Sequence, residues 1–123
     1  MSGKLYGVGL GPGDPDLMTL RAARLVAGAR VLAYPVLEGG ASFARPMSVA
    51  RAPAQAAYDV GAAAIAAALE AGDDVVCLCE GDPFFYGSFM YLFARLSAHF
   101  EVEVVPGVTS ITAGAARAGR PLV

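Results

Sequence analysis

The chain has 123 residues, 56% of them hydrophobic and 16% charged, which suits one folded domain and argues against a disordered chain. Its formal charge of −2 is spread without a basic stripe, so nucleic acid is not expected as a partner. No apolar run reaches the roughly 18 residues of a membrane-spanning helix, and the start lacks the pattern of a secretory signal, so we expect a cytoplasmic protein that does not enter a membrane.

The first elements of the chain are predicted to be a strand, a helix and a second strand. The apolar run at residues 4–10 ends in glycines and predicts a buried strand. A helix is expected from about Asp16 to Ala27, with Asp14 as its N-cap and Gly28 at its end. The second strand is expected in "RVLAYP", where the last residue, a proline, stops it.

The rest of the chain continues this alternation. An alanine-rich helix is expected over roughly Gln55 to Ala71, and the apolar strand "VVCLC" follows it. A helix at about Gly87 to His99, a strand in "EVEVV" and a last helix that ends at Gly119 complete the series. This rhythm favours an α/β fold with a parallel sheet.

Two cysteines, Cys77 and Cys79, lie on the third predicted strand. Positions two apart in a strand share a face, but this spacing is poor for a metal site, and no histidine or second cysteine pair completes one. We therefore expect buried, reduced core cysteines and no bound metal.

Three turns rich in glycine and proline follow three of the predicted strands: "GLGPGDP", "EGDPFFYG" and "VPGVTS". Ligands of open parallel sheets bind beyond the carboxyl ends of the strands. We therefore expect all three turns to face the same side of the sheet and to share one ligand.

The charges of these turns narrow the choice of ligand. The dinucleotide fingerprint GxGxxG fails in both registers, and no Walker sequence occurs. The turns carry four acidic residues and no lysine, so they would repel a polyphosphate, whereas S-adenosylmethionine offers hydroxyls, an ammonium and a cationic sulfur. The acids are Asp14, Asp16, Glu80 and Asp82. Glycine turns with aspartates are also common as plain caps, so this pattern alone leaves both interpretations open.

Together the three turns resemble motifs of the tetrapyrrole methylase family. They are a GxGPGD turn at Gly9 to Asp14, a GDPxxYG turn at Gly81 to Gly87 and a PGxTS turn at Pro106 to Ser110. The resemblance covers nearly the whole chain. The string "CEGDPFFYGSFMYLFARL" is similar to the branch that methylates precorrin-2 at C20, giving precorrin-3A in cobalamin synthesis.

The resemblance implies the fold of class III methyltransferases, not a Rossmann fold, with the methyl donor bound between two α/β domains. Residues 1–123 would then be the single N-terminal domain that binds S-adenosylmethionine, without the family's C-terminal domain. The full-length protein is expected to be a homodimer that acts on a small tetrapyrrole.

The resemblance also implies roles for particular residues. The S-adenosylmethionine site would consist of Gly11, Pro12, Gly13, Gly81, Asp82, Phe85, Thr109 and Ser110. Asp14 is expected on the substrate side, where Arg45 and Arg51 would meet substrate carboxylates unless both are merely solvated. Tyr86 and Glu80 are candidates to accept the proton that leaves the methylated carbon, although Tyr86 also suits a packed wall of the pocket.

Two departures from the family pattern leave parts of this interpretation open. Residues 36–58 are short for the helix and strand that the family usually places there, which puts the substrate-side loop in doubt. Pro35 stands where uroporphyrinogen methylases have an aspartate proposed as a base, so that base is not carried over. Open alternatives are another ring position, cobalt-precorrin-2 as substrate, a diphthine synthase-like activity and a non-enzymatic nucleotide-binding module. A further alternative is that the isolated domain binds nothing tightly and is inactive alone, because half of the pocket is missing.

Overall fold

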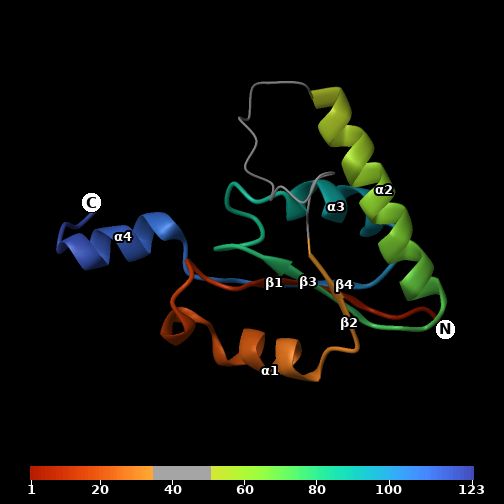
Figure 1. Ribbon diagram of the computed structural model, residues 1–123, viewed down its shortest axis with the longest axis horizontal. Helices are drawn as coiled ribbons and strands as arrows, with labels where there is room; N and C mark the ends of the chain where they lie inside the picture. The colour runs from red at the N-terminus through yellow and green to blue at the C-terminus, as the bar shows by residue number, and fades with distance from the viewer. Residues whose placement is uncertain (35–50) are drawn as a thin grey trace.

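A computed structural model describes residues 1–34 and 51–123 of the chain (Figure 1). Four parallel strands form one sheet in the order β2-β3-β1-β4. The strands are β1 (Leu5–Gly9), β2 (Val31–Ala33), β3 (Val75–Cys79) and β4 (Val102–Val105). The helices are α1 (Leu20–Gly28), α2 (Arg51–Glu70), α3 (Phe89–Leu96) and α4 (Ser110–Ala118), with a 3-10 turn η1 (Pro15–Leu17) before α1. The predicted α/β fold with a parallel sheet is confirmed.

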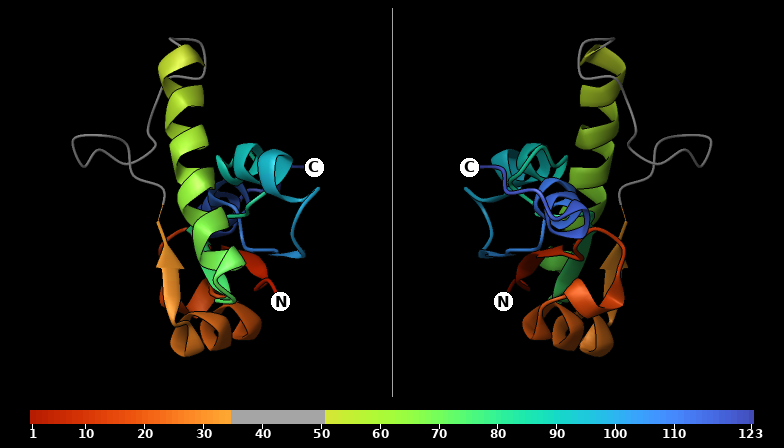
Figure 2. Two further views of the ribbon diagram at one scale, coloured as in Figure 1. Left: turned by 90° about the vertical axis from the view of Figure 1, so that its right-hand side faces the viewer. Right: turned by 90° about the vertical axis from the view of Figure 1, so that its left-hand side faces the viewer.

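Helices cover both faces of the sheet, with α1 on one side and α2 and α3 on the other (Figures 1 and 2). Successive side chains of a strand point to opposite faces, so each strand contributes to two separate cores. Leu5 and Cys77 pack beneath α2 and α3, where Phe89 is 1% exposed. Val8 packs on the opposite face with Ala22 of α1. The sheet is thus the middle layer of three.

Both cysteines are buried free thiols, as the sequence predicts. Cys79 Sγ lies 3.6 Å from the backbone oxygen of Cys77. The interaction with Cys77 and the burial of the thiol raise the pKa of Cys79, which keeps it protonated. In the part of the chain that the structure describes, no group of three or more His, Cys, Asp or Glu residues is placed to hold a metal ion.

The first α-helix begins later than the sequence suggests. Asp14 caps only the 3-10 turn, because its Oδ1 accepts a hydrogen bond from the backbone N–H of Asp16 at 2.9 Å. The chain then becomes extended, and α1 begins at Leu20, where Thr19 Oγ1 accepts a hydrogen bond from the N–H of Ala22 at 3.0 Å. The prediction of one continuous helix from Asp16 was therefore wrong, since a second cap starts a separate helix.

Two other predicted helix ends differ from the structure, whereas α1 ends at Gly28, as predicted. Helix α2 begins at Arg51, ahead of the predicted start, because Pro53 then falls in the first turn, where a missing N–H costs nothing. Helix α3 ends at Leu96, ahead of the predicted His99. The N–H of His99 donates to the backbone oxygen of Leu96, three residues earlier, at 3.1 Å, which is a tighter turn than that of an α-helix.

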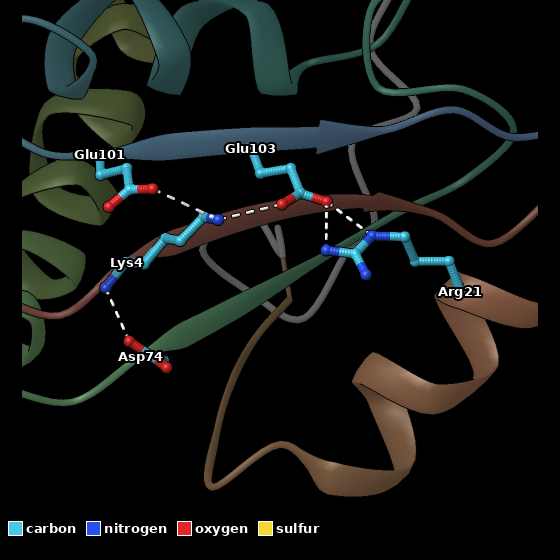
Figure 3. A network of polar contacts seen from close by, with 5 residues as sticks. All are labelled: Lys4, Arg21, Asp74, Glu101 and Glu103. Carbon is cyan, nitrogen blue, oxygen red and sulfur yellow. Dashed lines mark hydrogen bonds and ion pairs between the residues drawn. The ribbon is translucent and has the colours of Figure 1, made fainter.

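Charged side chains join the edge strand β4 to β1 and α1 (Figure 3). Lys4 Nζ lies 3.0 Å from Glu103 Oε1 and 3.4 Å from Glu101 Oε2. The other oxygen of Glu103 accepts a hydrogen bond from Arg21 Nε at 2.6 Å, and the backbone N–H of Lys4 donates to Asp74 Oδ1 at 2.8 Å. Hydrogen bonds from Lys4 and then Arg21 lower the pKa of Glu103 from its ordinary value.

Candidate functional site

The three glycine turns meet at one end of the sheet, beyond the carboxyl ends of β1, β3 and β4, at the left of Figure 1. We name them the first turn (residues 9–14), the second turn (80–87) and the third turn (106–110), and together the three-turn site. A pair of hydrogen bonds joins the first two: the N–H of Gly81 donates to Gly11 O at 2.9 Å, and the N–H of Gly11 donates to Gly81 O at 3.2 Å. The turns share one side, as predicted.

Glycines at the strand ends allow the three backbones to approach closely. A Cβ atom on Gly107 would lie 2.1 Å from the carbonyl oxygen of Gly81, and a Cβ atom on Gly9 would lie 2.5 Å from the same oxygen. Both distances are far inside van der Waals contact, so any larger residue would push the turns apart. We did not place Gly9 or Gly107 in the site from the sequence, although the glycine at or just beyond each strand end was an available signal.

Asp82 joins the second turn to the third. Its Oδ1 accepts a hydrogen bond from the backbone N–H of Gly107 at 2.9 Å, and its Oδ2 accepts one from the N–H of Phe84 at 2.9 Å. Each carboxylate oxygen has a second lone pair, so the group retains capacity to accept from a ligand. That Asp82 also holds the methyl donor stays a prediction.

Four other residues predicted for the donor site lie in the first and third turns. Thr109 is the N-cap of α4, and its Oγ1 accepts a hydrogen bond from the N–H of Thr112 at 3.3 Å. Ser110 is the first residue of α4 and is exposed. Pro12 and Gly13 are exposed at the tip of the first turn. These residues are at the same end of the sheet as Asp82, but their roles toward a ligand are untested.

Two aromatic side chains stand exposed on the second turn. Phe85 is 45% exposed and Tyr86 is 74% exposed, and their rings meet edge to face with centroids 4.9 Å apart. Tyr86 has a φ of +53°, a left-handed conformation that no other non-glycine residue adopts in the described chain. Glu80, the other candidate proton acceptor, is exposed directly after β3.

The predicted substrate side is described only in part. Arg45 lies outside the described residues. Arg51 is the first residue of α2 and not part of a loop, which corrects the sequence interpretation, because the alanine-rich helix extends further toward the N-terminus. Asp14 is exposed at the end of the first turn, next to η1.

The chemistry of the three-turn site suits a ligand that donates hydrogen bonds or carries positive charge. Its side chains are acidic or neutral, and no lysine or arginine lies in the three turns. A polyphosphate does not fit such a set, since no basic side chain of the three turns would balance its charge. Hydroxyls, an ammonium group or a cationic sulfur do fit carboxylate and carbonyl acceptors.

Known proteins match this chain over nearly its full length. Residues 4–123 match the family Tetrapyrrole (Corrin/Porphyrin) Methylases. The cobalamin biosynthesis protein CobIJ of Mycobacterium tuberculosis (strain ATCC 25618 / H37Rv) is 40% identical over an alignment of 147 residues, which covers 98% of this chain and 29% of that protein. The precorrin-2 C(20)-methyltransferase of Sinorhizobium sp is 38% identical, covering 98% of this chain and 60% of the relative.

The chain therefore spans less than two thirds of the length of these relatives. The alignments are also longer than the 123 residues of the chain, so the relatives carry residues within the aligned span that this chain lacks.

Solved structures show the same fold. The cobalt precorrin-4 methyltransferase CbiF matches with a TM-score of 0.74 at 30% identity, over 98% of this chain and 52% of that one. The uroporphyrin-III C-methyltransferase of Thermus thermophilus, complexed with S-adenyl homocysteine, matches with a TM-score of 0.63 at 31% identity, over 92% of this chain and 48% of that one. By sequence and by fold, the chain belongs to the tetrapyrrole (corrin/porphyrin) methylase family.

Proposed function

We propose that this chain is the donor-binding part of a methyltransferase that transfers a methyl group from S-adenosylmethionine to a tetrapyrrole. The observation that carries the proposal is the three-turn site, in which Gly11, Gly81 and Gly107 bring three backbones together beside acidic side chains. Its acceptors suit the ribose hydroxyls, the ammonium and the sulfonium of this donor. The bound S-adenyl homocysteine of the Thermus thermophilus relative supports the same ligand.

In this proposal the chain binds and orients the reactants. S-adenosylmethionine supplies a methyl group on a cationic sulfur. A substrate carbon can bond to this methyl group and displace the sulfur, which leaves as S-adenosylhomocysteine. Such a displacement is favoured mainly by alignment and by the exclusion of water, so no nucleophilic residue is needed. Gly81, Asp82 and Pro12 would hold the donor, while Phe85 would exclude water. The proton that leaves the methylated carbon would pass to Glu80 or to water.

The substrate that we propose is precorrin-2, methylated at C20 to give precorrin-3A in cobalamin synthesis. The Sinorhizobium relative bears the name of this activity and covers 98% of the chain. Methylation at another ring position, or of cobalt-precorrin-2, is the nearest alternative, because CobIJ is 40% identical to this chain and the uroporphyrin-III enzyme is 31% identical to it.

Location and assembly belong to the same proposal. Among the helices of the described residues, none has both the length and the apolar character to cross a membrane. We propose a cytoplasmic protein that works as a homodimer on a small-molecule substrate. Analytical ultracentrifugation of the chain at several concentrations would detect such a dimer.

The proposal is tested by titrating S-adenosylhomocysteine and, separately, ATP into the chain in a calorimeter. We expect S-adenosylhomocysteine to bind at least about tenfold more tightly, a difference of about 1.4 kcal/mol, because the turns repel phosphates. Tighter binding of ATP would favour a nucleotide-binding module, and no binding of either would overturn the proposal. Mass spectrometry of precorrin-2 incubated with S-adenosylmethionine and the full-length protein then tests whether one methyl group is added.

A further inference from the structure

The backbone of Tyr86 is held in a conformation that disfavours its own side chain. Its φ of +53° places Cβ against the following carbonyl, a crowding that only glycine escapes. The turn around it is closed, since a Cβ on Gly87 would lie 2.6 Å from the oxygen of Pro83, which is itself buried. A glycine in place of Tyr86 would satisfy this turn at lower cost, so the turn itself does not account for a tyrosine here.

Burial does not compensate for this strain. The Tyr86 side chain is 74% exposed, and its ring packs edge to face with Phe85, which is itself 45% exposed. An exposed aromatic pair gains little from the hydrophobic effect in the free protein. Strained residues cluster at active sites and ligand clamps, so this strain points to a contact that the ring makes when the site is in use.

The second turn, which is part of the three-turn site, presents this ring on a rigid base. Gly81 is hydrogen-bonded to the first turn, and Asp82 is hydrogen-bonded to the third. Tyr86 lies at the opposite end of the second turn from Gly81, shortly before α3 begins at Phe89. A tetrapyrrole that reached this end of the turn would present its conjugated ring to the exposed aromatic pair.

We propose that Tyr86, supported by Phe85, is a binding residue on which the tetrapyrrole ring stacks, and that its hydroxyl is not required. This inference rests on the proposed function. It replaces the proton-accepting role predicted for Tyr86 from the sequence with a role of its ring.

Three variants test it: Tyr86→Phe, Tyr86→Ala and Tyr86→Gly. The probe is uroporphyrin III, a stable tetrapyrrole whose affinity is measured by its fluorescence, and S-adenosylhomocysteine is titrated in parallel. We expect Tyr86→Phe to retain uroporphyrin III affinity within about twofold, and Tyr86→Ala and Tyr86→Gly to lose about tenfold, the size of one stacking contact. S-adenosylhomocysteine affinity should be the same in all three variants. Tyr86→Gly should unfold about 4 °C or more above Tyr86→Ala, because only glycine relieves the left-handed strain.

Each other outcome is decisive. Equal uroporphyrin III affinity in the parent and the Gly variant, or no binding by the parent, would overturn the stacking role. A loss of uroporphyrin III affinity in Tyr86→Phe as large as in Tyr86→Gly would assign the contact to the hydroxyl and would also overturn the stacking role. Loss of S-adenosylhomocysteine affinity alone would place Tyr86 against the donor instead. If the parent fails to bind S-adenosylhomocysteine while the uroporphyrin III results hold, the proposed function fails and the stacking role stands.

Discussion

At the scale of single residues, Asp82 holds two turns together by accepting hydrogen bonds from the backbone N–H groups of Gly107 and Phe84. Asp82→Ala removes both acceptors, and one of the two donors is partly buried. We expect the free energy of unfolding to fall by about 1 to 2 kcal/mol, measured by urea denaturation. Affinity for S-adenosylhomocysteine should fall at least about tenfold as the third turn is released.

The matched control for Asp82 is Asp82→Asn, which retains one acceptor oxygen and should lose less of both stability and affinity. A loss of affinity at full stability would show that the carboxylate acts on the ligand and not on the turns. Unchanged values in both measurements would contradict any role for Asp82 in the site.

Gly107 provides a second test at the same scale, with Gly114 as its matched control. A methyl group on Gly107 would lie 2.1 Å from the oxygen of Gly81, whereas one on Gly114, inside α4, meets nothing within 4 Å. We expect Gly107→Ala to lower the free energy of unfolding by about 1 to 3 kcal/mol. Gly114→Ala should raise it by about 0.5 to 1 kcal/mol, since alanine favours helix. Thermal unfolding that moved both variants in the same direction would contradict the close packing of the three turns.

At the scale of elements, all four strands were predicted. Strands β1 and β3 were predicted from apolar runs, because a buried parallel strand is apolar on both faces, and the edge strand β4 was predicted from the alternation of Glu and Val. Helix ends were harder to predict, since Asp14 and Thr19 both have cap chemistry and only the folded chain shows that each starts a separate turn. The motifs likewise indicated where the site lies. They did not show that Asp82 bonds to Gly107, because that pairing depends on β1 lying between β3 and β4, and apolar periodicity does not determine strand order.

The edge strand β4 offers an element-scale prediction about pH. Hydrogen bonds from Lys4 and Arg21 lower the pKa of Glu103 from its ordinary value of 4.5, so the unfolded chain takes up this proton first as the pH falls. The stabilisation is therefore fully present above about pH 4.5 and is lost as the pH falls through the lower, folded value. Glu103→Gln lacks this titration, so the parent should lose stability more steeply than the variant below about pH 4.5.

Chemical denaturation of both proteins at a series of pH values measures this difference. Solvent reaches the ion pairs of Glu103 with Lys4 and Arg21, and salt screens such pairs. The difference in stability between the two proteins should therefore shrink in high salt. Glu101→Gln is the control, since its carboxylate is farther from Lys4, at 3.4 Å against 3.0 Å, and it has no bond to Arg21. Parallel pH profiles for the parent and Glu103→Gln would contradict the assignment.

At the scale of the whole molecule, stability should decrease outward from the two central strands. Strands β1 and β3 each pair with two neighbours, and both have side chains in the two cores. Helix α4 has no buried residue, and it projects from the sheet beyond the third turn (Figure 1). Backbone hydrogen bonds with little packing around them open at low free energy.

Hydrogen-deuterium exchange read by mass spectrometry should therefore show the slowest exchange in β1 and β3 and the fastest helical exchange in α4. S-adenosylhomocysteine at about 100 times its dissociation constant should stabilise the fold by about 2.7 kcal/mol. Added protection should concentrate in the three turns and the first turn of α4, because the third turn leads directly into that helix. Helix α2 is the internal control. Hydrogen exchange of its backbone amides should slow only as much as the added stability of the whole fold accounts for. Protection of α2 without protection of the turns would place the ligand elsewhere on the molecule, and it would contradict the three-turn site.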